Sequence, residues 1–134
     1  MSTLGEEAAV RRLIARYANS LDLQAWDELG ECLSESVYTD FSDLRDLPPD
    51  SLSREAFVAA CRTALQAIKT HHMTGNVEAY INGTSATARV SALIFSRDDA
   101  GHVAHYHCLY LLGFESRGGK WSICSIVHRT LWRA

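Results

Sequence analysis

The second half of the chain consists of four long β-rich segments joined by short turns, and this pattern constrains the fold more than any other. The segments span residues 70–81, 84–97, 102–116 and 120–132. Asn82-Gly83 is the strongest of the turn signals, because Asn-Gly favours a two-residue hairpin turn in which both central residues have positive φ. Consecutive hairpins predict an antiparallel meander, and strands this long must twist and coil strongly.

The first half of the chain has the periodicity of α-helices. An apolar stripe with steps of three and four residues predicts a first helix, and Asp22 interrupts this stripe. A second short helix is expected to carry Trp26, Leu29 and Leu33 on one side, and the β-rich residues 37–41 predict a short strand. The stripe of the first helix consists of Val10, Leu13, Ile14, Tyr17, Ala18 and Leu21.

A polar segment, residues 42–53, leads into a third predicted helix. Its Pro48-Pro49 pair predicts a loop, which we expect to border the mouth of a pocket. Ser53 can cap the third helix. The buried face of that helix is expected to consist of Phe57, Val58, Cys61, Leu65 and Ile68.

Helices that pack on one face of an antiparallel sheet define the α+β class. We therefore expect three N-terminal helices on a strongly curved antiparallel sheet, which forms a cone-shaped barrel with an internal pocket. The 134 residues suit a single domain over residues 1–134. A chain of this length buries roughly two-thirds of its unfolded surface, which is enough for a core and one pocket.

Charge and composition exclude several classes of partner. The formal net charge is -3 and the pI is near 6.0, whereas nucleic-acid-binding proteins usually carry a clustered basic face. No apolar stretch approaches the roughly 20 residues that span a bilayer. The first ten residues lack the basic start and apolar run of a signal peptide, so a cytoplasmic protein is expected. The four cysteines form no C-x-x-C pair, so they are expected to be reduced and buried.

Two polar features are candidates for chemistry: Asp22, where the apolar stripe ends, and the His71-His72 doublet. Strand side chains alternate in direction, so only one of the two histidines can face inward. If His72 faces inward, Thr74 and Asn76 share its face. A carboxylate that binds an imidazole fixes the tautomer of the ring and allows it to take a proton from a substrate.

Each of these candidates also has a structural interpretation, and the residues alone leave both open. Asp22 is a natural N-cap for the helix that contains Trp26. Tyr17 lies on the core stripe, where a buried tyrosine is common, but its hydroxyl could also donate to a substrate oxygen. A lone histidine in a strand, such as His72, is often structural.

The last two long strands complete the expected pocket. His105 and His107 share one face of the third strand and could chelate a metal, but no third ligand is evident there, so no metal site is predicted. His128 and Arg129, near the end of the last strand with Trp132, could close the pocket or lie at a surface or dimer interface. The side chains expected to line the pocket are Trp26, Phe41, Thr74, Tyr106, Tyr110, His128 and Arg129.

Three motifs resemble those of one family. The run from Arg16 to Asp22, with Trp26-Asp27-Glu28-Leu29, resembles the N-terminal signature of the SnoaL-like branch of the nuclear-transport-factor-2-like superfamily. Residues 70–76 resemble its central strand motif and residues 119–123 its last strand. The resemblance covers nearly the whole chain and implies a homodimer or a higher homo-oligomer. Relatives include dehydratases, ketosteroid isomerase, polyketide cyclases and non-catalytic subunits.

Carried over by position, Asp22 and His72 match the Asp–His pair of scytalone dehydratase and of hexachlorocyclohexane dehydrochlorinase. Tyr17 matches a tyrosine of the bile-acid dehydratase. Other positions differ, since Leu21 and Phe41 stand where scytalone dehydratase has the two tyrosines that hold its catalytic water. Further functional positions of these two dehydratases correspond to Ser96, Tyr110 and Phe95. The resemblance therefore implies the chemistry of these enzymes rather than their substrates.

Two hypotheses follow for the function. The first is a cofactor-independent lyase or isomerase that acts on a small hydrophobic, cyclic oxygenated compound. His72 would be its general base, Asp22 the orienting partner and Tyr17 a hydrogen-bond donor. The second is a non-catalytic module of the same fold that binds a small ligand or serves in assembly.

Overall fold

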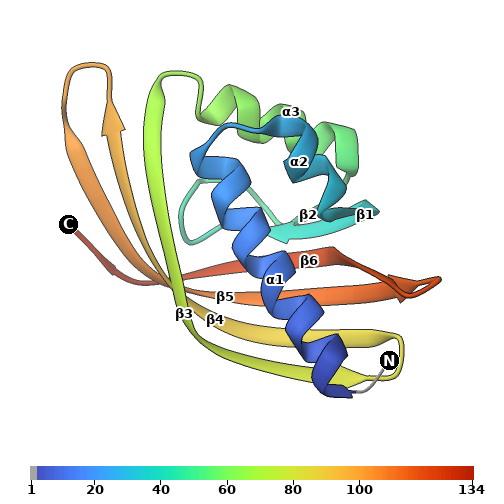
Figure 1. The fold of residues 1–134 in the computed structure, drawn as a ribbon. Helices are drawn as coiled ribbons and strands as arrows, with labels where there is room; N and C mark the ends of the chain where they lie inside the picture. Colours follow the sequence, from blue (N-terminus) through green and yellow to red (C-terminus); the bar gives the residue numbers. More distant parts are fainter. Residues whose placement is uncertain (1–2) are drawn as a thin grey trace.

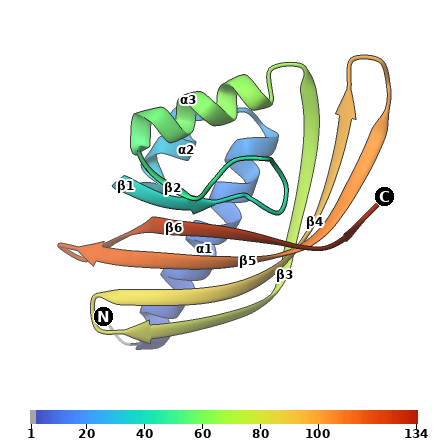
Figure 2. The same ribbon diagram turned by 180° about the vertical axis from the view of Figure 1, so that it is seen from behind.

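The structure is a computed structural model that describes residues 3–134, and its three helices lie on one side of a single curved sheet (Figure 1). Figure 2 shows that no described helix covers the opposite face of strands β3–β6. This arrangement confirms the predicted α+β class. The elements are α1 (Thr3–Asp22), α2 (Trp26–Glu31), β1 (Leu33–Asp40), β2 (Asp50–Ser53), α3 (Arg54–Ala64), β3 (Ile68–Asn82), β4 (Ser85–Asp98), β5 (Val103–Arg117) and β6 (Lys120–Arg133).

The six strands form one open sheet in the order β2-β1-β6-β5-β4-β3. Strands β3 to β6 are the predicted antiparallel meander. The prediction of a purely antiparallel sheet was wrong at one position, because β1 runs parallel to β6. The prediction of a loop over residues 42–53 was also wrong at its end, where residues 50–53 form β2 and pair with β1. None of the described helices has the length and apolar character needed to cross a membrane.

The hairpin between β3 and β4 lies where it was predicted, but its turn differs by one residue. Asn82 pairs with Ser85, so the two central residues are Gly83 and Thr84. Gly83 has a φ of 64°, whereas neither Asn82 nor Thr84 has a positive φ. Positive φ at the first central residue only is typical of a type II′ turn, which places glycine there.

The boundaries of two helices also differ from prediction. Leu33 begins β1 instead of extending α2, and Ile68 begins β3 instead of ending α3. Both residues remain apolar and inward-facing, so the spacing of their side chains fits either a helix or a strand. The predicted cap of α3 is confirmed, since the Ser53 Oγ accepts a hydrogen bond of 3.1 Å from the backbone N–H of Ala56.

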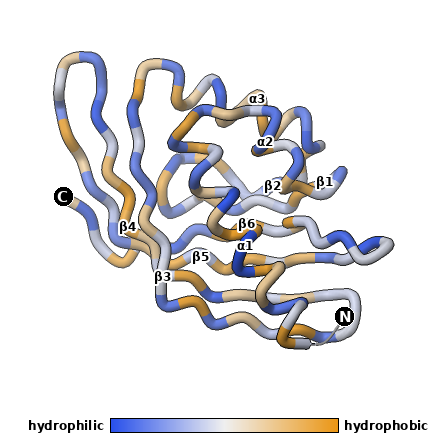
Figure 3. Tube along the Cα trace, viewed as in Figure 1, coloured by the Kyte–Doolittle hydropathy of each residue, from blue (hydrophilic) through white to orange (hydrophobic). Residues whose placement is uncertain are grey.

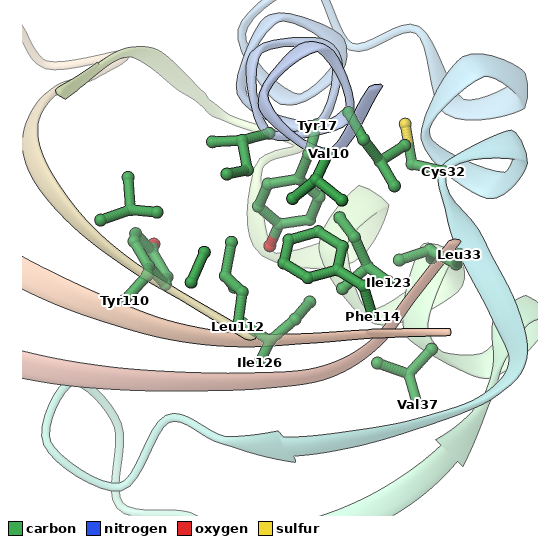
Figure 4. Packing of buried hydrophobic residues seen from close by; sticks show 14 of the residues in the cluster. Val10, Tyr17, Cys32, Leu33, Val37, Tyr110, Leu112, Phe114, Ile123 and Ile126 are labelled. Carbon is green, nitrogen blue, oxygen red and sulfur yellow. The ribbon is translucent and has the colours of Figure 1, made fainter. Parts of the chain in front are cut away.

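The hydrophobic core fills the space between α1 and the concave face of the sheet. Val10 and Tyr17 project from α1 toward Phe114 and Ile126 of the sheet (Figure 4). Hydrophobic and hydrophilic residues alternate along the strands (Figure 3), as expected for a sheet with one buried face. Toward the β4–β5 hairpin, the inner faces of β4 and β5 also line a cavity, through Ile94, Ser96, Tyr106 and Tyr110. The core therefore closes only one end of the cone.

Candidate functional site

A cavity of about 410 Å³ occupies the other end of the cone. Its walls come from α1, α3, β1, β2, the loop between β1 and β2, and the inner faces of strands β3–β5, and they are mostly apolar. Arg45 is the only lysine, arginine or carboxylate residue in this described lining. The lining side chains are Tyr17, Leu21, Thr39, Phe41, Leu44, Arg45, Leu47, Leu52, Phe57, Ala60, Cys61, Ala64, Leu65, Ile68, Thr70, His72, Ile94, Ser96, Tyr106 and Tyr110.

Asp22 and His72 meet at this cavity. The Nδ1 atom of His72 lies 2.6 Å from Oδ1 of Asp22, and the backbone N–H of His72 donates to Oδ2 at 2.8 Å. The hydroxyl of Thr70 donates a third hydrogen bond, of 3.0 Å, to Oδ1. The side chains of His72 and Asp22 are only 9% and 14% exposed. The last residue of α1 is thus held against β3 by three hydrogen bonds.

The structure contradicts the alternative in which Asp22 caps the next helix. The N-cap residue of α2 is Ala25, and no side chain caps that end. Asp22 instead directs both carboxylate oxygens at β3. Thr70 was missed in the sequence, although strand alternation places it on the same face as His72 two residues earlier.

Hydrogen bonding sets the charge of Asp22. Burial alone raises the pKa of this carboxyl, but the hydrogen bonds from the ring and backbone of His72 and from Thr70 outweigh burial and lower the pKa. An ionised carboxylate can only accept, so Nδ1 of His72 is the donor. The Nε2 atom of a neutral ring is then left as an acceptor, which is the form that a general base requires.

The lowered pKa of Asp22 predicts a pH-dependent contribution to stability. A carboxylate with a lower pKa in the folded state stabilises the fold above its unfolded pKa, about 3.9, and this contribution is lost as pH falls through the folded pKa. The Asp22→Asn substitution removes the carboxylate and with it this contribution to stability. Urea unfolding of wild type and Asp22→Asn should therefore show a difference in the free energy of unfolding that narrows below about pH 4. A difference that stays constant down to pH 2 would contradict the assignment.

Two tyrosines contribute hydroxyls to the cavity. Tyr17 extends from α1 into the interior and Tyr110 projects from β5 (Figure 4). Burial raises the pKa of both phenols well above the ordinary value, so both are neutral donors. Neither hydroxyl has a hydrogen-bond partner among residues 3–134. Both can therefore donate to an oxygen of a bound molecule.

Thr74 is exposed and does not line the cavity as predicted, and a bulge in β3 follows it. The register shifts between Gly75 and Glu78, and Asn76 has a φ of 47°. The bulge reverses which side chains face inward, since His72 precedes it and Val77 follows it. Thr74 lies next to this irregularity and is exposed.

Three further residues predicted to line the cavity lie elsewhere. Trp26 packs on the core from α2. The guanidinium of Arg129 pairs with Asp40 at 3.1 Å. His128 is buried behind the cavity wall, against the ring of Phe41. Phe41, Tyr106 and Tyr110 line the cavity, as expected. Leu21 and Ser96, which the resemblance aligns with functional positions of scytalone dehydratase, also lie in its wall.

His105 and His107 lie on the outer face of the sheet, away from the cavity. Their rings are joined by a hydrogen bond of 3.0 Å between Nδ1 of His105 and Nε2 of His107. The ring of His107 stacks on Trp132 with centroids 3.5 Å apart. Trp132 is thus part of this outer face and does not close the pocket, so of its alternatives the surface and dimer-interface roles stay open.

Comparison with known proteins identifies the family. The family model of the SnoaL-like domain matches residues 2–127. The chain belongs to the SnoaL-like domain family. This confirms the resemblance to the SnoaL-like branch of the nuclear-transport-factor-2-like superfamily that was seen in the sequence motifs.

Individual relatives of this SnoaL-like protein are distant in sequence. Scytalone dehydratase-like protein claB from Passalora fulva is 26% identical over 129 residues, which cover 87% of this chain and 79% of that protein. The Kfla4162 protein of Kribbella flavida superposes with a TM-score of 0.95 at 19% identity, over 99% of this chain and 95% of that one. The dehydrochlorinase LinA-type3 from Novosphingobium barchaimii, which is named for hexachlorocyclohexane, has a TM-score of 0.85 at 12% identity, over 98% and 90%.

Proposed function

We propose that this protein is a cofactor-independent lyase or isomerase of the dehydratase type, acting on a small hydrophobic, cyclic oxygenated compound. The observation that carries the proposal is the hydrogen bond between His72 and Asp22 at the wall of a mostly apolar cavity. A low-dielectric surrounding strengthens such a pair, and the cavity limits the water that competes with a substrate.

The roles of the residues follow from their positions. Nε2 of His72 takes a proton from a carbon beside a carbonyl, and Asp22 stabilises the imidazolium that forms. The electron pair of the broken C–H bond forms a double bond as a neighbouring C–O bond breaks. The proton then returns to the leaving hydroxyl, so one water is lost and no oxidant or reductant is needed. Tyr17 donates a hydrogen bond to the carbonyl oxygen on which charge develops.

The cavity and the relatives support the substrate class. A volume of about 410 Å³ lies within the roughly 300–1,000 Å³ of small-molecule sites. The names of two relatives, a dehydratase-like protein and a dehydrochlorinase, both refer to eliminations. Leu21 and Phe41 line the cavity. By the sequence resemblance they correspond to the two tyrosines of scytalone dehydratase, so we propose a substrate other than scytalone.

The test is turnover of a panel of cyclic β-hydroxy ketones in D₂O. We expect loss of one water, or deuterium incorporation beside the carbonyl, for at least one compound, with both measured by mass spectrometry. Asp22→Asn should slow this reaction, because the amide neither fixes the tautomer nor stabilises the imidazolium. Asp27→Asn, which changes an exposed carboxylate on α2, should keep the wild-type rate. Reaction no faster than in buffer across the panel would contradict the proposal.

A second candidate is a binding or assembly module, which the outer sheet face favours. Among its side chains, Phe95, Leu111 and Trp132 are 39–55% exposed, although large apolar side chains are commonly buried. A module of this kind would bind small molecules from the panel without converting them. The homodimer and the cytoplasmic location expected from the sequence stay predictions under either function.

A further inference from the structure

His128 is a buried side chain whose polar atoms have no protein partner. Its exposed fraction is 0%, and neither ring nitrogen has a hydrogen-bond partner among the described residues. The large majority of buried side-chain polar atoms in proteins are hydrogen-bonded. An unsatisfied buried donor or acceptor destabilises the fold, since the group has lost its contact with water. The fold therefore does not explain why an imidazole occupies this position.

Two aromatic rings separate His128 from the cavity. The ring of Phe41 stacks on the imidazole, with centroids 6.1 Å apart and planes 22° apart. The ring of Tyr110 meets the imidazole edge-on at 5.3 Å. Both rings line the cavity. His128 thus lies one aromatic layer behind the wall of the proposed site.

Burial favours the neutral form of the His128 imidazole. Burial lowers its pKa; Asp43 opposes this shift, whereas Arg129, Arg45 and His72 act in the same direction as burial. A neutral imidazole has one donor nitrogen and one acceptor nitrogen. The ring can therefore bind either a hydroxyl or a carbonyl oxygen.

Of the two covering rings, Phe41 is the less buried and lies in a loop. Tyr110 lies within β5, which is paired on both sides. Phe41 is only partly buried and is the first residue of the loop after β1. Flanking residues attach this loop to β6, since Arg129 pairs with Asp40 and the backbone N–H of Thr130 donates to Asp43 at 3.0 Å. A rotation of the Phe41 ring would therefore open His128 to the cavity without detaching the loop.

We propose that His128 is a second ligand-binding imidazole of this cavity, which hydrogen-bonds an oxygen of the bound molecule that reaches past Phe41. The inference rests on the proposed function, which makes this cavity the site where the ligand binds. It narrows the ligand class to ring compounds with two separated oxygen substituents, one near His72 and one at His128.

The binding test compares 2-naphthol with a set of naphthalenediols by titration calorimetry. For wild type, at least one diol should bind about 2- to 12-fold more tightly than 2-naphthol, which is the value of one net hydrogen bond. His128→Leu should abolish this advantage and leave the affinity for 2-naphthol unchanged. His102→Leu, which removes an 82% exposed imidazole, should preserve it. A wild type without any diol advantage, or an advantage that persists in His128→Leu, would overturn the inference.

A stability measurement separates this role from a structural one. Because the imidazole nitrogens are unsatisfied, His128→Leu should raise the Tm by a few degrees, and His128→Met provides a second apolar variant if leucine does not fit. A clear fall of the Tm in both variants would overturn the inference, since the imidazole would then stabilise the fold by itself. Neither measurement needs turnover, so a failure of the proposed lyase activity would be seen separately in the ketone panel.

Discussion

His72→Gln is expected to lower the turnover of a responsive substrate by about 10²–10⁴-fold, the range typical of general acid–base catalysis. The glutamine amide can still donate a hydrogen bond to Asp22, so it can replace the 2.6 Å contact between His72 and Asp22. Its amide cannot take a proton from carbon at neutral pH, so binding is retained while proton transfer is lost. The measurement is kcat and KM for the compound that responds in the ketone panel.

The histidine doublet supplies the matched control for this prediction. His71 is exposed and points away from the cavity, one residue from His72 in the same strand. His71→Gln should therefore retain the wild-type kcat. Equal losses in the two variants would point to a disturbed strand instead of a lost base, and an active His72→Gln would remove His72 from the mechanism.

Phe114→Ala is expected to lower the free energy of unfolding by about 3–5 kcal/mol, the usual effect of removing a buried aromatic ring. Phe114 is 2% exposed in β5 and packs below Tyr17 and Val10 at the closed end of the cone (Figure 4). Domains of this size have total stabilities of about 5–15 kcal/mol. The variant should accordingly unfold at much lower urea concentration, with the transition followed by circular dichroism.

Phe95→Ala is the control for this core prediction. Phe95 is 39% exposed on the outer face of β4, so its removal leaves no closed cavity behind. The expected loss of stability is therefore much smaller than for Phe114→Ala. A comparable loss for both variants would mean that the outer face is buried in an assembly, and repeating the unfolding at several protein concentrations would reveal it.

The sequence predicted the elements that local rules govern. The four long strands follow from turn residues and β-rich composition, and the Ser53 cap of α3 follows from a hydrogen bond between near neighbours. The residues singled out Asp22 and His72 as candidates, and the resemblance to SnoaL-like proteins supported their pairing across the 50 positions that separate them in the chain. Periodicity alone could place each of them on an inward face but could not bring them together.

Tertiary structure decided the features that depend on contacts between distant segments. Residues 50–53 form a strand because β1 offers them an edge, and β1 runs parallel to β6 because the chain crosses over between them. The bulge at Asn76 reversed the inward face of β3 beyond His72, and packing placed His128 behind Phe41. By itself, the sequence determined which segments are helical or extended, because φ preferences and side-chain periodicity act locally. Which residues line the cavity depends on strand register and loop position, and these are set only when the sheet packs against α1.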